Sequence, residues 1–232
     1  MKRLALTVIA VCMLLFCGCG GDADVTPVIS AVQSPPDRLH CNFTFNIRFG
    51  EELSTLLFSM GSFDADYAQN TLSAQLTRTV LASAAAVTLE YDGKTCVTTI
   101  EGEEHIYEMT PEEVFGGMVY ARPLFPDGKY SATLSSDGLY TVKCKAPDSA
   151  KLFALLGDDI YSIAYIKAPL RDKMYCSDAV FTYRLKDGII TDYSLSFTAH
   201  LFDTPPYVPG VKVDESDYEL ELDVAFTASY QQ

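Results

Sequence analysis

The residue types most often used for acid–base chemistry are sparse in this chain. Its three histidines, His40, His105 and His200, are widely separated in the sequence. An enzyme built on this chain would need His105 or His200 beside carboxylates in a cleft. Because three scattered histidines are more simply explained as surface or hydrogen-bonded side chains, we expect no catalytic residue and no enzyme.

Motifs that mark known chemistries are also missing. The chain has no G-x-S-x-G, no G-x-x-x-x-G-K and no H-E-x-x-H, which mark a nucleophilic serine, a phosphate-binding loop and a zinc site. Carboxylates do cluster, but calcium needs six or more oxygens in a shaped loop, and no cluster has EF-hand spacing. We therefore expect solvated turns, no metal site and no cofactor at Asp64 and Asp66, at Glu101, Glu103, Glu104 and Glu108, and at Asp214, Glu215 and Asp217.

Four cysteines fall in the part of the chain expected to fold: Cys41, Cys96, Cys144 and Cys176. In an exported protein these are possible disulfide cysteines, with three alternative pairings. Cys41 and Cys144 nevertheless share the apolar face of strand-like segments, as buried thiols do. The sequence leaves both alternatives open. No C-x-x-C occurs among them, which argues against thiol–disulfide exchange.

Charge excludes one large class of partner. The 232 residues include 17 Lys and Arg against 31 Asp and Glu, a net charge of −14. A nucleic-acid binder needs a basic patch, so we expect no nucleic-acid partner. Anionic lipid would also repel this chain, so any membrane attachment must be hydrophobic or covalent. With 48% hydrophobic residues, the chain has ample apolar content for a folded core.

The N-terminus reads as an export signal. Lys2 and Arg3 precede an apolar run over residues 4–16, and small residues follow it. A basic start, a short apolar stretch and small residues describe a secretory signal. The run is shorter than the roughly 18–20 residues of a membrane-spanning helix. An uncleaved anchor helix is the alternative.

The end of this signal, Leu15-Phe16-Cys17-Gly18-Cys19, resembles the lipobox of bacterial lipoproteins. That motif places a small residue before the cysteine that receives a diacylglyceryl group. Cys19 fits with Gly18 before it, whereas Cys17 would follow the bulky Phe16. The resemblance implies lipidation at Cys19 and anchoring on the outer face of a bacterial cytoplasmic membrane. An ordinary secreted protein cut near the same glycines is the alternative. The expected domains are a lipoprotein signal peptide at 1–18, a lipidated cysteine with a flexible tether at 19–40, and a single β-rich domain at 41–232.

The body of the chain alternates apolar and polar residues. This period of two predicts strands with one buried face and favours an antiparallel sheet. It recurs over residues 41–49, 72–77, 87–91, 140–144, 193–199 and 220–226. Residues 82–86 fit a helix or a strand, and their β-favouring neighbours favour the strand.

Asp-Gly pairs and two helix starts complete the pattern. Asp92-Gly93, Asp137-Gly138 and Asp187-Gly188 follow strand-like runs and predict hairpins in series. Thr110-Pro-Glu-Glu113 is a capping box, and a helix is predicted from Asp148 to Leu156 with Gly157 as its stop. The fold class is therefore α+β: a long-stranded, curved, mainly antiparallel meander sheet with about two short helices on its concave side.

An anchored lipoprotein with long meandering strands resembles the LolA/LppX-like lipoproteins. The similarity is strongest over residues 181–199 and 218–228, and the Asp-Gly hairpins also suit it. The resemblance implies a half-barrel with helices over its open mouth and an apolar cavity for lipids or acyl chains.

The aromatic residues give the candidate ligand site. The expected cavity lining consists of Phe43, Phe45, Phe49, Tyr140, Tyr193 and Phe197 on strands, with Leu152 and Leu156 from a helix. The function predicted is a non-enzymatic binding module that holds or carries a lipid or other hydrophobic ligand. The alternative is a structural or interaction lipoprotein with a fully packed core, which engages another envelope protein.

Overall fold

The computed structural model describes residues 23–49, 54–115 and 130–231, apart from 208, 211, 213 and 215–217. This part of the chain forms eleven strands and four short helices. The helices are α2 (Thr26–Gln33), α3 (Pro111–Phe115), α4 (Ser149–Leu156) and α5 (Asp159–Ile163). The strands are β1 (Arg38–Phe49), β2 (Thr55–Asp66), β3 (Thr71–Val80), β4 (Ser83–Tyr91), β5 (Thr95–Ile100), β6 (Glu103–Glu108), β7 (Ser131–Leu134), β8 (Leu139–Cys144), β9 (Tyr175–Lys186), β10 (Ile189–Phe202) and β11 (Glu219–Gln231).

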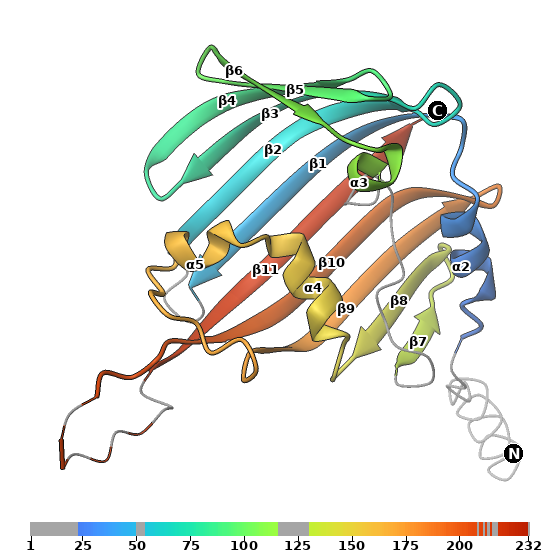
Figure 1. Cartoon of the computed structure of the whole chain (residues 1–232). Helices are drawn as coiled ribbons and strands as arrows, with labels where there is room; N and C mark the ends of the chain where they lie inside the picture. The colour runs from blue at the N-terminus through green and yellow to red at the C-terminus, as the bar shows by residue number, and fades with distance from the viewer. Residues whose placement is uncertain are drawn as a thin grey trace, which may run out of the picture.

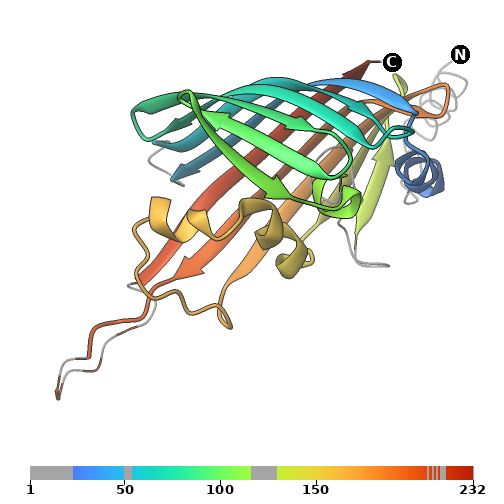
Figure 2. The same cartoon turned by 45° about the horizontal axis from the view of Figure 1, so that its top comes forward.

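All eleven strands belong to one antiparallel sheet with the order β6-β5-β4-β3-β2-β1-β11-β10-β9-β8-β7 (Figure 1). Two meanders, β1–β6 and β7–β11, are joined where β1 pairs with β11. That pairing runs from His40 opposite Gln231 to Phe49 opposite Leu222. The edge strands β6 and β7 lie at opposite ends of the sheet and do not pair with each other (Figure 2). The sheet is therefore open.

The predicted alternation matches the burial of the central strands. In β11 every second residue from Leu222 to Tyr230 is buried, and the residues between them carry polar or small side chains. The opposite face is rich in hydroxyl groups, with Thr44 bonded to Thr227 and Thr182 bonded to Ser194, each at 2.6 Å. One face of the sheet thus supplies the apolar core, as the period of two predicted. The ambiguous segment at residues 82–86 lies almost entirely in strand β4.

The three Asp-Gly pairs each separate two consecutive strands, so these hairpins are confirmed. Asp187 and Gly188 have φ values of 54° and 81°, the two positive angles that a type I′ turn requires. Glu101 and Gly102 do the same between β5 and β6, with φ of 52° and 87°. The turn at Glu101 places the acidic residues that follow it on strand β6.

The segment expected to be a flexible tether is partly folded. Thr26–Gln33 forms α2, in which Val28 and Ala31 are buried, and the backbone N–H of Ala23 donates to the carbonyl of Ala132 at 2.9 Å. Strand β1 also begins at Arg38, three residues before the expected domain boundary at 41. Pro27 at the start of the helix and two buried side chains explain why this stretch packs on the sheet.

Both predicted helices are present, each with the predicted start. Glu113 N–H donates to Thr110 Oγ1 at 3.3 Å, while Thr110 N–H donates to Glu113 Oε2 at 2.7 Å, which completes the capping box of α3. Asp148 accepts from Lys151 N–H at 3.3 Å and caps α4. Gly157, with φ of 70°, follows the last residue of α4. Leu152 of α4 is fully buried. In the described part of the chain, no helix has the length and apolarity needed to cross a membrane.

Candidate ligand pocket

An apolar pocket of about 350 Å³ lies between α3 and the first five strands. It is lined by Phe43, Phe63, Leu72, Ala74, Leu89, Cys96, Met109, Glu113, Val114 and Phe226. Nine of these ten side chains are apolar, and the pocket volume falls at the lower end of the roughly 300–1,000 Å³ of small-molecule sites. The pocket therefore suits one small hydrophobic group or a single acyl chain.

A row of aromatic rings crosses the sheet into this pocket. It runs over five neighbouring strands, and successive ring centroids are 5.2, 5.8, 6.3 and 6.1 Å apart. The members, from β9 to β2, are Tyr183, Tyr193, Phe226, Phe43 and Phe63. Such ring pairs add about 0.5–1.5 kcal/mol each beyond their buried area. The row holds the walls of the pocket in place.

Two small residues give the Phe43 ring its space. Phe43 pairs with Gly61 of β2 on one side and with Ala228 of β11 on the other. Gly61 has no room for a side chain, since a Cβ there would lie 2.2 Å from the carbonyl oxygen of Gln75 on β3. A glycine in a strand marks such a close backbone approach.

Helix α3 is fixed to the sheet by its ends. Before it, the Tyr91 hydroxyl donates to the carbonyl oxygen of Met109 at 3.0 Å. At its last residue, the Phe115 ring contacts Tyr67 at 5.0 Å and Tyr91 at 6.2 Å between centroids. Val114, between these contacts, faces the pocket. The short helix is thereby held as a wall of the pocket.

Glu113 places one negative charge at the pocket. Its carboxylate accepts from the backbone N–H and the hydroxyl of Thr110, at 2.7 and 2.9 Å. These bonds, the backbone one first, lower the pKa of Glu113 below its usual value. Among the described residues that line the pocket there is no lysine or arginine.

The predicted lining residues are distributed over the whole apolar face. Phe43 lines the pocket, and Tyr193 stands in the aromatic row that leads to it. Phe197 and Leu152 are buried in the packed core, and the others pack against that core from partly buried positions: Phe45, Phe49, Tyr140 and Leu156.

The sequence did not single out Phe63, Leu72, Leu89, Met109, Val114 or Phe226 as pocket residues. For Leu72, Leu89 and Phe226, alternation gave the correct face of the sheet. Alternation does not predict the strand pairing that brings β1, β2 and β11 together.

The three histidines do not converge. His40 is paired with Asp64 at 2.8 Å, and His105 is exposed on the edge strand β6. His200 is buried and lies 2.9 Å from Glu219. The three acidic clusters lie in different places. In the first, Asp66 pairs with Arg38 at 2.8 Å. In the second, Glu103, Glu104 and Glu108 lie on β6, and in the third, residues 215–217 are outside the described part.

Cys41, Cys96 and Cys176 are buried thiols in this structure, and Cys144 is buried as well. Burial raises the pKa of Cys41 and of Cys176 to about 12. Thiolates are the reactive form, so both thiols are inert at neutral pH. Cys17, Cys19 and the signal segment lie outside the described residues.

A larger hollow of about 890 Å³ differs in chemistry from this pocket. It is lined largely by hydroxyl and amide side chains such as Thr44, Thr182 and Gln75. In this open hollow, hydroxyl and amide side chains stand among the apolar ones, whereas the pocket beside α3 is lined almost entirely by apolar side chains. The pocket beside α3 is therefore the better candidate site for a hydrophobic molecule.

Comparisons with known proteins identify no family for this chain. No protein-family model and no curated protein matches the chain. Among solved structures, it is similar to the dehydratase domain from the CurJ module of curacin polyketide synthase. The identity is 9%, the alignment covers 90% of this chain and 80% of that one, and the TM-score is 0.14. An inactive mutant of the same dehydratase in complex with a compound gives 9% identity, 89% and 79% coverage and a TM-score of 0.13. Values this low carry no conclusion about fold or function.

Proposed function

We propose that this protein is a non-enzymatic, lipid-anchored binding module that holds a hydrophobic ligand in the pocket beside α3. The observation that carries the proposal is the pocket itself. It is an apolar space of about 350 Å³ with one polar side chain among its described lining residues, walled by an ordered aromatic row and a tethered helix. Affinity would come from burial of apolar surface, at about 25 cal/mol per Å².

The half-barrel architecture of LolA/LppX-like lipoproteins is part of this proposal. Two observations support it. Helices α3, α4 and α5 lie on the same side of the sheet in both views (Figures 1 and 2), and that side carries the apolar face. Strands β4–β6 bend over toward this side in Figure 2. A sheet curved in this way would enclose a ligand between its strands and the helices.

The negative charge at the pocket favours neutral over anionic ligands. Glu113 lines the pocket, the described lining residues include no lysine or arginine, and the chain carries a net charge of −14. A free fatty-acid anion entering here would find no cationic partner among the described lining residues and would be repelled by the negative charge. The pocket thus favours a neutral hydrophobe, such as an esterified acyl chain, over an anionic one.

Anchoring at Cys19 would hold the folded domain close to the bilayer. Ala23 is already bonded to β7 through the carbonyl of Ala132. Four residues reach at most about 14 Å when fully extended. A diacylated Cys19 would therefore keep the β7 end of the sheet at the membrane surface, on the outer face of the cytoplasmic membrane, which suits exchange of a lipid with that membrane.

Titration with the neutral fluorescent probe N-phenyl-1-naphthylamine tests the proposal. Ala74 faces the pocket between Phe63 and Leu89, its partners on β2 and β4. Substitution by Leu and then by Phe fills the space in two steps, so probe affinity should fall in that order, by tenfold or more for Ala74→Phe. Ala84→Phe, on an exposed position of the same sheet, is the matched control and should bind like the parent protein.

The alternative function is a structural or interaction lipoprotein that engages another envelope protein. The dense packing beneath α4, where Leu152 and Phe197 are buried, favours it for that half of the sheet. The same titration decides between the two. If the parent protein takes up no probe, or if Ala74→Phe binds it unchanged while retaining its near-UV circular dichroism, the ligand pocket is refuted.

A further inference from the structure

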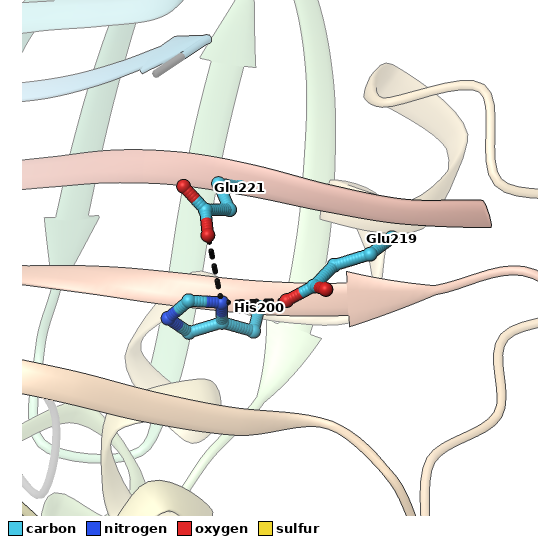
Figure 3. A group of neighbouring side chains, drawn as sticks. All are labelled: His200, Glu219 and Glu221. Atoms are coloured by element: carbon cyan, nitrogen blue, oxygen red, sulfur yellow. Dashed lines mark hydrogen bonds and ion pairs between the residues drawn. The ribbon is translucent and has the colours of Figure 1, made fainter. Parts of the chain in front are cut away.

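His200 lies among carboxylates at the end of the sheet away from the ligand pocket. Its Nδ1 is 2.9 Å from Glu219 Oε1 and 3.5 Å from Glu221 Oε1 (Figure 3). Glu221 is the direct cross-strand partner of His200, and Glu219 is two residues before it on β11. The three side chains therefore share one face, and their ligand atoms all lie within 4.8 Å of one another.

The His200 ring is fixed by the strand on its other side. Ser177 Oγ lies 3.1 Å from Nε2, and the Tyr175 ring stacks on the imidazole at 4.1 Å with an interplanar angle of 8°. The imidazole side chain is only 9% exposed. When Ser177 accepts a hydrogen bond from Nε2–H, the lone pair of Nδ1 points toward the two carboxylates. A histidine oriented in this way by an outer hydrogen bond is the usual arrangement of a metal ligand.

A β-bulge in β9 creates this geometry. Asp178 has φ of 51°, and the β9–β10 register shifts between Ser196 and Thr198. Cys176 and Ala179 are both buried although three residues apart, which regular alternation does not allow. The bulge lets Ser177 and Tyr175 lie on the side of His200.

The two carboxylates beside His200 carry more negative charge than one histidine can neutralise, which favours a bound cation. Among the ion pairs of the described residues, Glu219 and Glu221 have no lysine or arginine partner, and His200 is the basic group that lies beside them. Nδ1 carries one proton at most, so it cannot donate a full, linear hydrogen bond to both carboxylates at once. A divalent ion would neutralise both.

We infer that His200, Glu219 and Glu221 bind a divalent transition-metal ion, with zinc as the best fit. One imidazole nitrogen and two carboxylate oxygens are zinc ligands, with bonds of about 2.0–2.2 Å. Tetrahedral ligands at that distance are about 3.4 Å apart, and the two distances from His200 Nδ1 to the glutamate oxygens, 2.9 and 3.5 Å, lie on either side of this value. Calcium and magnesium, which prefer sites made of oxygen alone, fit less well. A bound ion would link β10 to the start of β11 and would leave one coordination position for water.

This site is independent of the proposed lipid-binding function, because it shares no residue with the pocket. The experiment is titration of the purified full domain, residues 19–232, with zinc chloride followed by calorimetry, native mass spectrometry and X-ray absorption. We expect one zinc ion per chain, a first shell of nitrogen and oxygen without sulfur, and no comparable binding of magnesium or calcium.

Variants locate the ion. Glu221 is largely exposed, so Glu221→Gln should leave the fold intact and weaken zinc binding at least tenfold. Ser177→Ala removes the positioning bond and should weaken it by about 10–100-fold. Glu103→Gln, on the exposed edge strand, and His40→Gln, at the separate histidine–carboxylate pair with Asp64, are matched controls that should bind as the parent does. Absence of zinc binding by the parent, equal affinity in Glu221→Gln, or sulfur in the first shell would each overturn the assignment.

Discussion

Replacement of Gly61 by alanine should lower the stability of this protein, although the same substitution usually raises stability at an unobstructed position. In an unobstructed strand, glycine to alanine stabilises a protein by roughly 0.5–1 kcal/mol, because the unfolded chain loses freedom. At Gly61 the new Cβ would lie 2.2 Å from the Gln75 carbonyl oxygen and 2.6 Å from the Leu76 Cα, whereas ordinary contacts begin at 3.4 Å. Both atoms belong to the backbone of β3, so the clash is relieved only if β2 and β3 separate by about 1 Å.

We therefore expect Gly61→Ala to destabilise the protein by about 1–3 kcal/mol, the usual cost of overpacking. With a urea dependence of about 2–3 kcal/mol per M, the unfolding midpoint should fall by about 0.3–1.5 M. Because Gly61 is the cross-strand neighbour of Phe43, probe affinity of the pocket should fall as well. Ser62→Ala, one residue along the same strand, is the control and should change stability by less than about 0.5 kcal/mol. A Gly61→Ala midpoint equal to or above that of the parent would refute the close approach of β2 and β3.

Three further predictions concern the rest of the chain. Leu81 is exposed with φ of 54°, so Leu81→Asn should raise the urea midpoint by relieving about 1 kcal/mol of backbone strain, and a lower midpoint would contradict this. The pKa of Cys41 and Cys176 is raised to about 12 by burial. Their neutral form therefore stabilises the fold below the unfolded pKa of about 8.5, and that stability is lost as the pH rises toward 12. Urea midpoints should decline from pH 8.5 upward, and maleimide should label both thiols only as fast as the protein unfolds; rapid native labelling would disprove their burial. Cys19→Ser should abolish incorporation of labelled palmitate in cells while Cys17→Ser keeps it, and the opposite pattern would move the acceptor to Cys17.

The local features of the fold could be predicted because they depend on neighbouring residues. Alternation located the strands around Phe43, Tyr193 and Phe226, and Asp187-Gly188 supplied the two residues of a type I′ turn. The capping box at Thr110 depends on two side chains three residues apart. The helix at Thr26–Gln33 was missed because its stability comes from burial of Val28 and Ala31 against the sheet, and eight residues without that packing do not form a stable helix.

The candidate sites depend on pairings between distant parts of the chain. The pocket brings Phe43 together with Phe226, and the metal site adds Ser177 to a histidine 23 residues later. Alternation gives the face of a residue but no information about its cross-strand partner. The bulge at Asp178 shifts the register within β9, so alternation extended back from the buried Phe181 would place Ser177 and Tyr175 on the face opposite to His200.

The pairing of β1 with β11 joins the two meanders at the middle of the sheet. Among the described strands, β1 is synthesised first and β11 last. The edge of β1 that pairs with β11 therefore stays unpaired until the rest of the chain has been made. Loss of the final dozen residues would therefore remove the strand pairing that joins the two meanders and would leave the aromatic row interrupted between Tyr193 and Phe43. A reporter fused at the carboxyl end would likewise begin at the tip of a central strand of the sheet and not at an edge strand (Figure 1).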